Sequence, residues 1–304
     1  MMIDCEGVDN PLFYVIVVFI YWDMMIKSPL KWAGNKFRVL PHLLPLIGTP
    51  TRYCEPFGGS LSVALNVHAD EYILNDINSD LYFLYTNIDI EFVSDCTQIF
   101  VDDNNSRQKY IEMRNRFNSE TDARERAKLF LYLNKHAFNG LCRYNSKNEF
   151  NVPYGKENKN SKTGKIENTK AHFPEKEMLD FIATFNNRCV EFTNTTFSNE
   201  LLYESLGEGD VVYFDPPYVP ASETSNFTNY ATDGFTHEQQ IELRDLAETL
   251  VNRGIKVILS NHDVPVTREL YKNAEIHSIQ VSRSISANSS SRKKANELIA
   301  VWQS

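Results

Sequence analysis

The sequence predicts an α/β fold, in which helices cover both faces of a mainly parallel sheet. After residue 26, short apolar runs typical of buried strands alternate with segments of helical spacing. Strands that alternate with helices pair in parallel, because each helix returns the chain to the same end of the sheet. The chain has 304 residues, 42% of them hydrophobic, which is enough to fill a sizeable core.

Six segments have the short apolar pattern of strands: residues 51–57, 71–78, 210–218, 255–263, 276–285 and 297–302. Between the first two, residues 60–69 have helical spacing. Residues 236–254 are predicted to form a helix, because Thr236 and Gln239 have the spacing of a capping box and Gly254 follows as a stop signal.

The middle of the chain has a different pattern. Residues 91–138 are predicted to be helical, and residues 139–177 are polar, with turn residues and two short β-like pieces. The net charge of the whole chain is −9, so a nucleic-acid site would have to be a local basic patch. Residues 136–176 carry eight Lys and Arg against four acids, and residues 283–294 carry no acid. Both clusters could instead be solvated loops.

The five cysteines form no C-x-x-C pair, which favours reduced thiols in a cytoplasmic protein over a disulfide framework, and we expect no metal. Residues 11–22 are apolar but shorter than the ~20 residues that span a bilayer. The acids before them argue against a secretory signal. A core element or a membrane-seeking tail stays open, but we favour an extension outside the fold for residues 1–26, because Met24 and Met25 could be the original start.

Two strand ends carry the residues of a nucleotide site. Gly58 and Gly59 follow the first strand, where glycine lets a ligand approach the backbone at a helix start. Asp76 ends the next strand, 17 residues after Gly59, where an acid can take ribose hydroxyls. Asp76 could equally cap the following helix. A dinucleotide and S-adenosylmethionine both fit this pattern.

Residues 215–218, "DPPY", favour S-adenosylmethionine, because methylation of an exocyclic amine needs these groups and hydride transfer does not. The lone pair of adenine N6 is delocalised into the ring. Acceptors on both N6 hydrogens localise it, and Asp215 and the Pro216 carbonyl can supply them, with Pro217 restricting the turn. Tyr218 offers a face on which the base can stack. An adenine in a duplex must flip out to reach such a pocket. An acidic turn with two rigid prolines is the alternative.

Several blocks occur in one order between about residues 28 and 302: "LKWAGNK", "EPFGGSLSV", "ILNDINSDL", "FNGLCRYN", "EFNVPYG", "VVYFDPPY", "SNFTNY", "ILSNHD" and "SRSISANSSSRKK". In these blocks the chain resembles the DNA adenine methyltransferase (Dam) family. The resemblance implies a Rossmann-like S-adenosylmethionine-dependent methyltransferase domain of residues 27–90 and 190–304. It also implies a helical and β-hairpin target-recognition insert of residues 91–189. The family usually methylates adenine N6 in GATC, in double-stranded DNA and as a monomer.

The resemblance also implies residue roles. Cofactor contacts match Trp32, Ala33, Gly34, Lys36, Pro56, Phe57, Gly59, Ser60, Asp76 and Asp215. DNA contacts match Lys31, Phe138, Asn139, Leu141, Arg143, Pro153, Lys156, Arg283, Asn288, Arg292 and Lys293. Among these, Phe138 matches an aromatic wedge and Lys156 a phosphate contact. Arg143 can pair with guanine in the major groove.

Three departures from the family pattern affect these expectations. Leu61 stands where a second glycine is common, and Asn35 stands where another glycine is common. Asn tolerates a positive φ, so the turn at Asn35 can survive. The loop 157–172 is longer than is usual in the family and rich in Lys and Asn, and it lies beside "FNGLCRYN" (residues 138–145), which matches the hairpin that enters the DNA. Methylation of RNA or a protein amine, a DNA-binding regulator without catalysis, and a nicotinamide enzyme are the rival functions.

Overall fold

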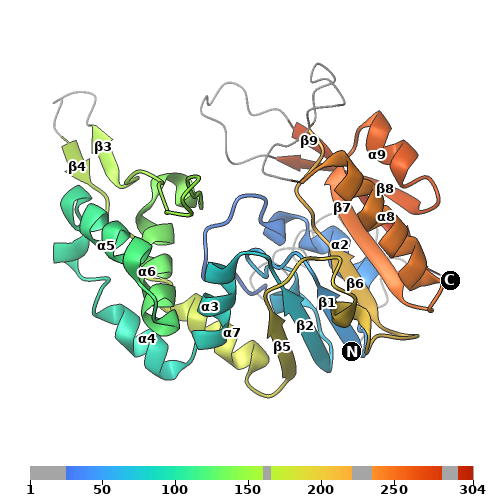
Figure 1. Ribbon diagram of the computed structural model, residues 1–304, viewed down its shortest axis with the longest axis horizontal. Helices are drawn as coiled ribbons and strands as arrows, with labels where there is room; N and C mark the ends of the chain where they lie inside the picture. Colours follow the sequence, from blue (N-terminus) through green and yellow to red (C-terminus); the bar gives the residue numbers. More distant parts are fainter. Residues whose placement is uncertain (1–24, 160–165, 221–234, 283–293, 304) are drawn as a thin grey trace, which may run out of the picture.

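A seven-stranded sheet forms the centre of the computed structural model, which describes residues 25–159, 166–220, 235–282 and 294–303 (Figure 1). In spatial order its strands are β5 (Cys189–Thr193), β2 (Glu71–Asn75), β1 (Arg52–Glu55), β6 (Val211–Phe214), β7 (Lys256–His262), β9 (Lys294–Trp302) and β8 (Glu275–Ser282). The first five are parallel, and β9 is antiparallel to both β7 and β8. The predicted Rossmann-like, mainly parallel sheet is therefore confirmed.

Alternate side chains of each strand enter two separate cores. In β6, Val211 and Tyr213 pack in one core, whereas Val212 and Phe214 pack in the other. The first core also contains side chains of α2 (Leu40–Ile47), α3 (Ser79–Asn87) and α7 (Glu175–Phe185). The second is closed by α8 (His237–Val251), η5 (Glu200–Tyr203) and the end of α9 (Pro265–Leu270). Helical structure thus covers both faces of the sheet, as predicted.

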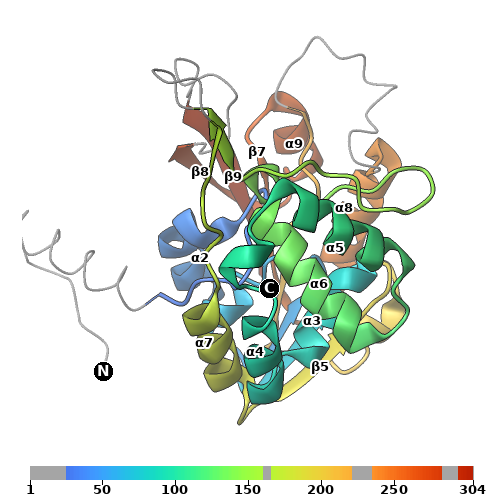
Figure 2. The ribbon, with the colours of Figure 1, turned by 90° about the vertical axis from the view of Figure 1, so that its left-hand side faces the viewer.

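The helices of the middle segment gather beside the sheet, on the left in Figure 1. They are α4 (Ile90–Thr97), α5 (Arg107–Ser119) and α6 (Ala123–His136), with the short hairpin β3 (Glu157–Lys159) and β4 (Ile166–Asn168). Figure 2 shows α5 and α6 side by side, and α6 also packs on α3. The packing of α3 on α6 connects this segment to the sheet domain just after β2.

Most predicted elements are confirmed, including all six strands. The N-terminus of α8 has the predicted capping box, in which Thr236 Oγ1 accepts from Gln239 N and Gln239 Oε1 accepts from Thr236 N. The predicted helix over residues 60–69 is wrong, since only the 3₁₀ turn η2 (Ala64–Asn66) forms there. This segment is buried almost throughout and has no polar face, and Leu61 has a left-handed φ of 54°.

Across the described ranges, no helix combines the length and apolar character that a bilayer crossing requires.

Candidate active site and nucleic-acid interface

Three sequence-distant blocks follow neighbouring strands at one edge of the sheet. Residues 56–59 follow β1, Asp76 follows β2 and Asp215 follows β6. The strand order reverses between β1 and β6, because the chain goes from β1 to β2 on one side and later to β6 on the other. In open α/β sheets such a switch point, at the carboxyl ends of the strands, is where ligands bind.

Asp215 and Lys36 form an ion pair at this point. Lys36 Nζ lies 2.8 Å from Asp215 Oδ2 and donates to Gly34 O at 2.7 Å. The Lys36 side chain is only 7% exposed. Asp215 Oδ1 is buried and has no hydrogen-bond partner among the described residues. A buried acceptor without a donor is costly, so this oxygen is a candidate contact for a ligand N–H group.

Glu55 is a second buried acid close to Asp215, and it was not predicted as a site residue. Burial raises the pKa of Asp215 above its ordinary value, and the Lys36 ammonium opposes that shift. Burial also raises the pKa of Glu55 to about 8. With Glu55 neutral, one ammonium would face one carboxylate at this point. The sequence signal for Glu55 was an acid at the end of a buried strand, directly before Pro56.

The turn that follows Asp215 is held from both sides. The Pro217 carbonyl accepts a hydrogen bond from Gln240 Nε2 of α8 at 2.9 Å, and Val219 N donates to Asn261 Oδ1 of β7 at 3.0 Å. Asn261 is fully buried and donates in turn to Gln240 Oε1 at 3.2 Å. These bonds fix the backbone on either side of Tyr218. Neither residue was predicted as part of the site: Asn261 lies in the block "ILSNHD", to which no role was assigned, and Gln240 lies in α8, outside the quoted blocks.

The ring of Tyr218 has charged and aromatic neighbours. Lys36 Nζ lies 4.7 Å from the ring centroid, within the range of a cation–π interaction. His262 meets the ring edge to face at 4.9 Å, and the hydroxyl donates to Glu297 Oε2 at 3.2 Å. Tyr218 is partly exposed, so its position is fixed while part of its surface remains accessible.

The glycine loop lies against Asp76 and Trp32. Gly59 N and Asn78 N each donate to one carboxylate oxygen of Asp76 at 2.8 Å. A Cβ on Gly59 would lie 2.9 Å from Trp32 Nε1, and Gly59 has a φ of 49°, so glycine is required there. Asp76 thus stabilises the turn before α3, but it is not the helix cap that one interpretation expected, because Asn78 is the N-cap. Each of its oxygens can still accept another donor.

Two departures from the family pattern have different outcomes. Leu61 adopts a φ of 54° and is 1% exposed, so it takes the strained conformation that glycine would relieve. Left-handed backbone costs roughly 1–2 kcal/mol for a non-glycine residue, which the burial of the leucine side chain can offset. The expectation of a positive φ at Asn35 is wrong. Its φ is −48°, it caps a 3₁₀ turn, and the exposed Gly34 beside Ala33 carries the positive φ of 78°.

The other predicted cofactor residues contact neighbouring parts of the protein. The carbonyl of the buried Pro56 accepts from Asn75 Nδ2 at 2.9 Å. Phe57 stacks on Phe197 with ring centroids 5.3 Å apart. Ser60 is buried and shares a 2.7 Å hydrogen bond with Ser62. These contacts shape the loop around Gly59.

The two predicted DNA-contacting loops, which contain Phe138 and Pro153, pair through their backbones. Phe138 N donates to Pro153 O, and Gly155 N donates to His136 O, both at 2.9 Å. A Cβ on Gly155 would lie 2.3 Å from Phe138 Cα, so only glycine allows this approach. The pairing leaves the Phe138 side chain 51% exposed, although it is a large aromatic. The Phe138 ring is therefore accessible to a partner, although a single exposed apolar side chain does not by itself mark a binding surface.

Lys31, in the block "LKWAGNK", lies at the same surface. Asn134 bonds the Lys31 backbone twice, through Lys31 N at 2.9 Å and Lys31 O at 2.7 Å. A Cβ on Gly140 would lie 2.3 Å from Lys31 Cβ, so the loop packs directly on the lysine. Lys31 is exposed, but partial desolvation by the loop packed on it and the neighbouring Lys156 lower its pKa to about 8. Two ammonium groups this close favour an anionic ligand.

Arg143 lies farther along the loop that begins at Phe138. Its side chain is exposed, and Nε donates to Asn151 Oδ1 at 2.7 Å. Asn139 has a φ of 53°, which helps to form the tight turn, and Leu141 is partly buried against the core. The structure thus brings Lys31, Phe138, Pro153 and Lys156 together. The predicted contacts Arg283, Asn288, Arg292 and Lys293 lie outside the described residues, as does the block "SNFTNY".

Comparison with known proteins gives consistent matches over most of the chain. The family model described as "D12 class N6 adenine-specific DNA methyltransferase" matches residues 32–285. The "DNA adenine methylase" of Escherichia coli (strain K12) is 42% identical over 91% of this chain and 95% of its own length. The proteins of the same name from Salmonella typhi and Vibrio cholerae are 41% and 38% identical, each over 91% of this chain and 95% and 96% of their own lengths.

Solved structures align more loosely. The rRNA methyltransferase aviRa from Streptomyces viridochromogenes gives a TM-score of 0.37 at 9% identity, over 90% of this chain and 89% of that chain. A precorrin-6y C5,15-methyltransferase from Geobacter metallireducens gives a TM-score of 0.36 at 9% identity, over 90% of this chain and 94% of that chain.

Proposed function

Because the chain belongs to the D12 class of N6 adenine-specific DNA methyltransferases, we propose that it takes its methyl group from S-adenosylmethionine and methylates the adenine of GATC in duplex DNA. Methylation of DNA adenine follows from the family itself. The methyl donor, the target sequence and the residues that act are the parts that we propose.

The buried Asp215 Oδ1 is the observation that supports the catalytic role. We propose that it accepts one N6 hydrogen of the flipped adenine, which would satisfy an oxygen that has no partner among the described residues. The Pro216 carbonyl would accept the second hydrogen, since the neighbouring Pro217 carbonyl already bonds Gln240. Two acceptors draw the nitrogen toward tetrahedral geometry and free its lone pair. Holding the amine in this position is a proximity effect.

The loop around Gly59 fits S-adenosylmethionine. Gly59 brings bare backbone against the Trp32 indole, and the Asp76 oxygens keep acceptor capacity for ribose hydroxyls. Lys36 would hold Asp215 ionised beside the methyl donor. The cofactor supplies an electrophilic methyl group on a sulfonium. The chain's own residues orient the amine and exclude water from it.

The surface that contains Lys31, Phe138, Pro153 and Lys156 is the proposed DNA interface. The exposed Phe138 would wedge into the stack and lower the cost of flipping the adenine. Lys31 and Lys156 would neutralise phosphate or contact base edges, which relieves their mutual repulsion. Arg143 would read a guanine by a bidentate contact worth ~1–3 kcal/mol.

Single-base mapping of N6-methyladenine tests the proposal. The purified protein is incubated with S-adenosylmethionine and unmethylated plasmid, beside an RNA transcript of the same sequence and with Asp215→Ala as the matched control. We expect methylation at GATC adenines in the DNA only. A different DNA motif would refute the proposed target but keep the chemistry. Methylation of the RNA alone, or none on either substrate, would refute the proposed function.

A further inference from the structure

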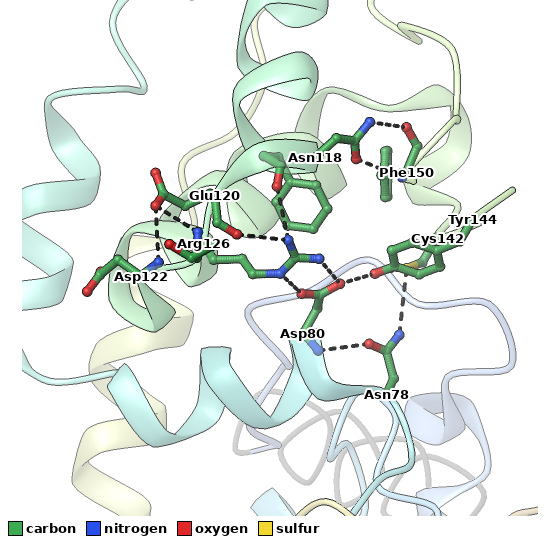
Figure 3. A network of polar contacts seen from close by, with 11 residues as sticks. Asn78, Asp80, Asn118, Glu120, Asp122, Arg126, Cys142, Tyr144 and Phe150 are labelled. Atoms are coloured by element: carbon green, nitrogen blue, oxygen red, sulfur yellow. Dashed lines mark hydrogen bonds and ion pairs between the residues drawn. The ribbon is translucent and has the colours of Figure 1, made fainter. Parts of the chain in front are cut away.

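A buried polar cluster connects the cofactor side of the sheet with residues 138–156, a segment closed by the antiparallel bridge of Tyr144 and Phe150 that we call the recognition hairpin (Figure 3). Its centre is Asp80 in the first turn of α3, which is 2% exposed. Arg126 of α6 binds this carboxylate through Nε at 2.5 Å and through a terminal nitrogen at 3.3 Å. Tyr144 of the hairpin donates its hydroxyl to Asp80 Oδ2 at 2.5 Å. Three segments thus share one carboxylate.

The cluster lies next to the proposed cofactor acid. Asn78 N donates to Asp76 Oδ1 at 2.8 Å, and Asn78 Oδ1 accepts from Asp80 N at 2.9 Å. The Asn78 amide also reaches Cys142 Sγ of the hairpin, at 3.9 Å. The turn between Asp76 and Asp80 therefore contacts the proposed cofactor loop through one residue and the hairpin through others.

Each side of the hairpin is anchored to a different part of the molecule. Tyr144 and Phe150 face each other in an antiparallel bridge. Asn118 of α5 bonds the Phe150 backbone twice, at 2.8 and 3.2 Å, while Tyr144 is anchored on Asp80. Arg143 directly precedes Tyr144, so the Tyr144 anchor fixes the backbone from which the exposed Arg143 side chain projects.

Arg126 makes the Asp80 anchor rigid. Besides the carboxylate, it donates to the carbonyls of Phe117 at 3.0 Å and Glu120 at 3.3 Å, at the end of α5. Its guanidinium also lies 4.2 Å from the Phe117 ring centroid. A planar group fixed at this many points allows little movement of Asp80.

We propose that Asp80, held by Arg126, is a positioning residue that acts through Tyr144 to aim Arg143, and that this anchor sets the discrimination between target sites. The inference rests on the proposed function, because it assigns to Arg143 the reading of a base. It predicts that losing the Tyr144 hydroxyl changes which sites are methylated more than whether the cofactor binds.

Tyr144→Phe removes this one hydroxyl and keeps the ring, which packs edge to face on Phe150 at 5.8 Å. The measurement is kcat/KM on a GATC duplex and on duplexes with one G·C pair changed, together with the Kd of S-adenosylmethionine. We expect the ratio of kcat/KM values to fall about tenfold, within the range of one base contact, and the cofactor Kd to stay unchanged. Partial unfolding would not imitate this result, because the amount of active enzyme cancels in the ratio.

Arg143→Ala completes a double-mutant cycle. If Tyr144 acts through Arg143, adding Tyr144→Phe to Arg143→Ala lowers discrimination no further. Tyr132→Phe is the matched control, since its buried hydroxyl donates to Asn104 O at 2.6 Å within the same insert. It should leave the discrimination ratio as in the wild type.

Three results would overturn the inference: wild-type discrimination in Tyr144→Phe, full additivity with Arg143→Ala, or an equal loss in Tyr132→Phe. A wild-type protein that methylates no DNA would instead refute the proposed function. The two failures are therefore distinguishable in one set of assays.

Discussion

In the proposed mechanism the partly buried Asp215 has to stay ionised, and Lys36 is the residue that favours its charged form. Burial favours the neutral acid, whereas the ammonium at 2.8 Å favours the carboxylate. A protonated Asp215 would donate a proton where the proposed mechanism needs an acceptor. Activity should therefore fall as the pH drops toward the raised pKa of this group.

Lys36→Met removes the ammonium and keeps much of the side-chain volume. We expect methyl transfer to weaken and the acidic limb of its pH profile to move up by about 1–3 pH units, because an opposite charge shifts a carboxylate pKa by that amount. The measurement is single-turnover methyl transfer across pH. Arg38→Met, which removes an exposed cation two residues on, is the control. An unmoved acidic limb in Lys36→Met would contradict the role of Lys36.

Glu55→Gln tests the neutral state of Glu55. A glutamine keeps an oxygen to accept from Tyr53 Oη and Ala64 N, which both lie 3.0 Å from Glu55 Oε2. The folded pKa of Glu55 is about 8, above its ordinary value of 4.5, so its stabilising contribution is full below about pH 4.5 and is lost as the pH rises through about 8.

We therefore expect the free energy of unfolding to fall less between about pH 5 and about pH 8 in Glu55→Gln than in the wild type. Urea titrations at several pH values measure the difference. Identical pH dependences in the two proteins would show that Glu55 is already ionised at neutral pH.

Single residues show where sequence reasoning reaches its limit. Asp215 and Asp76 were predicted from motifs and Lys36 from the family resemblance, and the structure brings Lys36 against Asp215. Glu55 was not predicted, since its role depends on burial beside Asp215, and the packing of the sheet creates that proximity. The φ of Asn35 was mispredicted because Gly34, one residue earlier, takes the turn.

At the scale of elements, the strands with strong apolar runs were predicted, whereas the edge strand β5 was not. β5 is an edge strand whose side chains are exposed or only partly buried, so it has little apolar signal. The apolar segment 60–69 was predicted as a helix because periodicity cannot tell a buried helix from other buried structure. Tertiary packing and the strained Leu61 decided its conformation.

The limits of the insert remain a prediction. The proposed segment of residues 91–189 includes α7. Its Phe185 packs edge to face on Tyr72 of β2, and its Phe181 stacks on Phe192 of β5. If the insert ends before α7, this helix belongs to the sheet domain and covers one face of its sheet. We therefore favour an insert of α4 to β4.

Two residues of the recognition hairpin should have different roles, Arg143 in reading a base and Lys156 in binding a phosphate. Arg143→Ala should cost about 1–3 kcal/mol at the proposed target and relax the choice of one base pair. Lys156→Ala should weaken binding to all duplexes alike and reduce the salt slope by about 1. Affinities for cognate and altered duplexes over a salt series measure both. Interchanged behaviour of the two variants would contradict these assignments.

At the scale of the whole molecule, an acidic protein must bind a polyanion through one local surface. The net charge of −9 opposes long-range attraction to DNA, so local basic residues have to supply the binding, and among the described residues we propose Lys31 and Lys156 for this role. The overall charge made nucleic-acid binding look improbable from composition alone. The motifs and the folded arrangement of the lysines point the other way.

DNA affinity should depend on pH through Lys31. In the free protein its pKa is about 8, and bound DNA would favour the charged form, so binding takes up a proton above that pH. We expect affinity to fall between about pH 7 and about pH 9 and this fall to shrink in Lys31→Met. Fluorescence anisotropy with a labelled duplex measures it. A wild-type affinity that is flat over this range would argue against Lys31 at the interface.

The most direct test of the central claim is the single-turnover rate of methyl transfer by Asp215→Ala and Asp215→Asn, with cofactor and DNA affinities measured in parallel. Asp215→Ala loses the buried acceptor and should transfer no detectable methyl while it still binds DNA. Asp215→Asn keeps one carbonyl oxygen and should retain a small fraction of the rate. Transfer by Asp215→Ala at a rate near that of the wild type would contradict the assignment of Asp215 as the group that accepts the adenine N6 hydrogen.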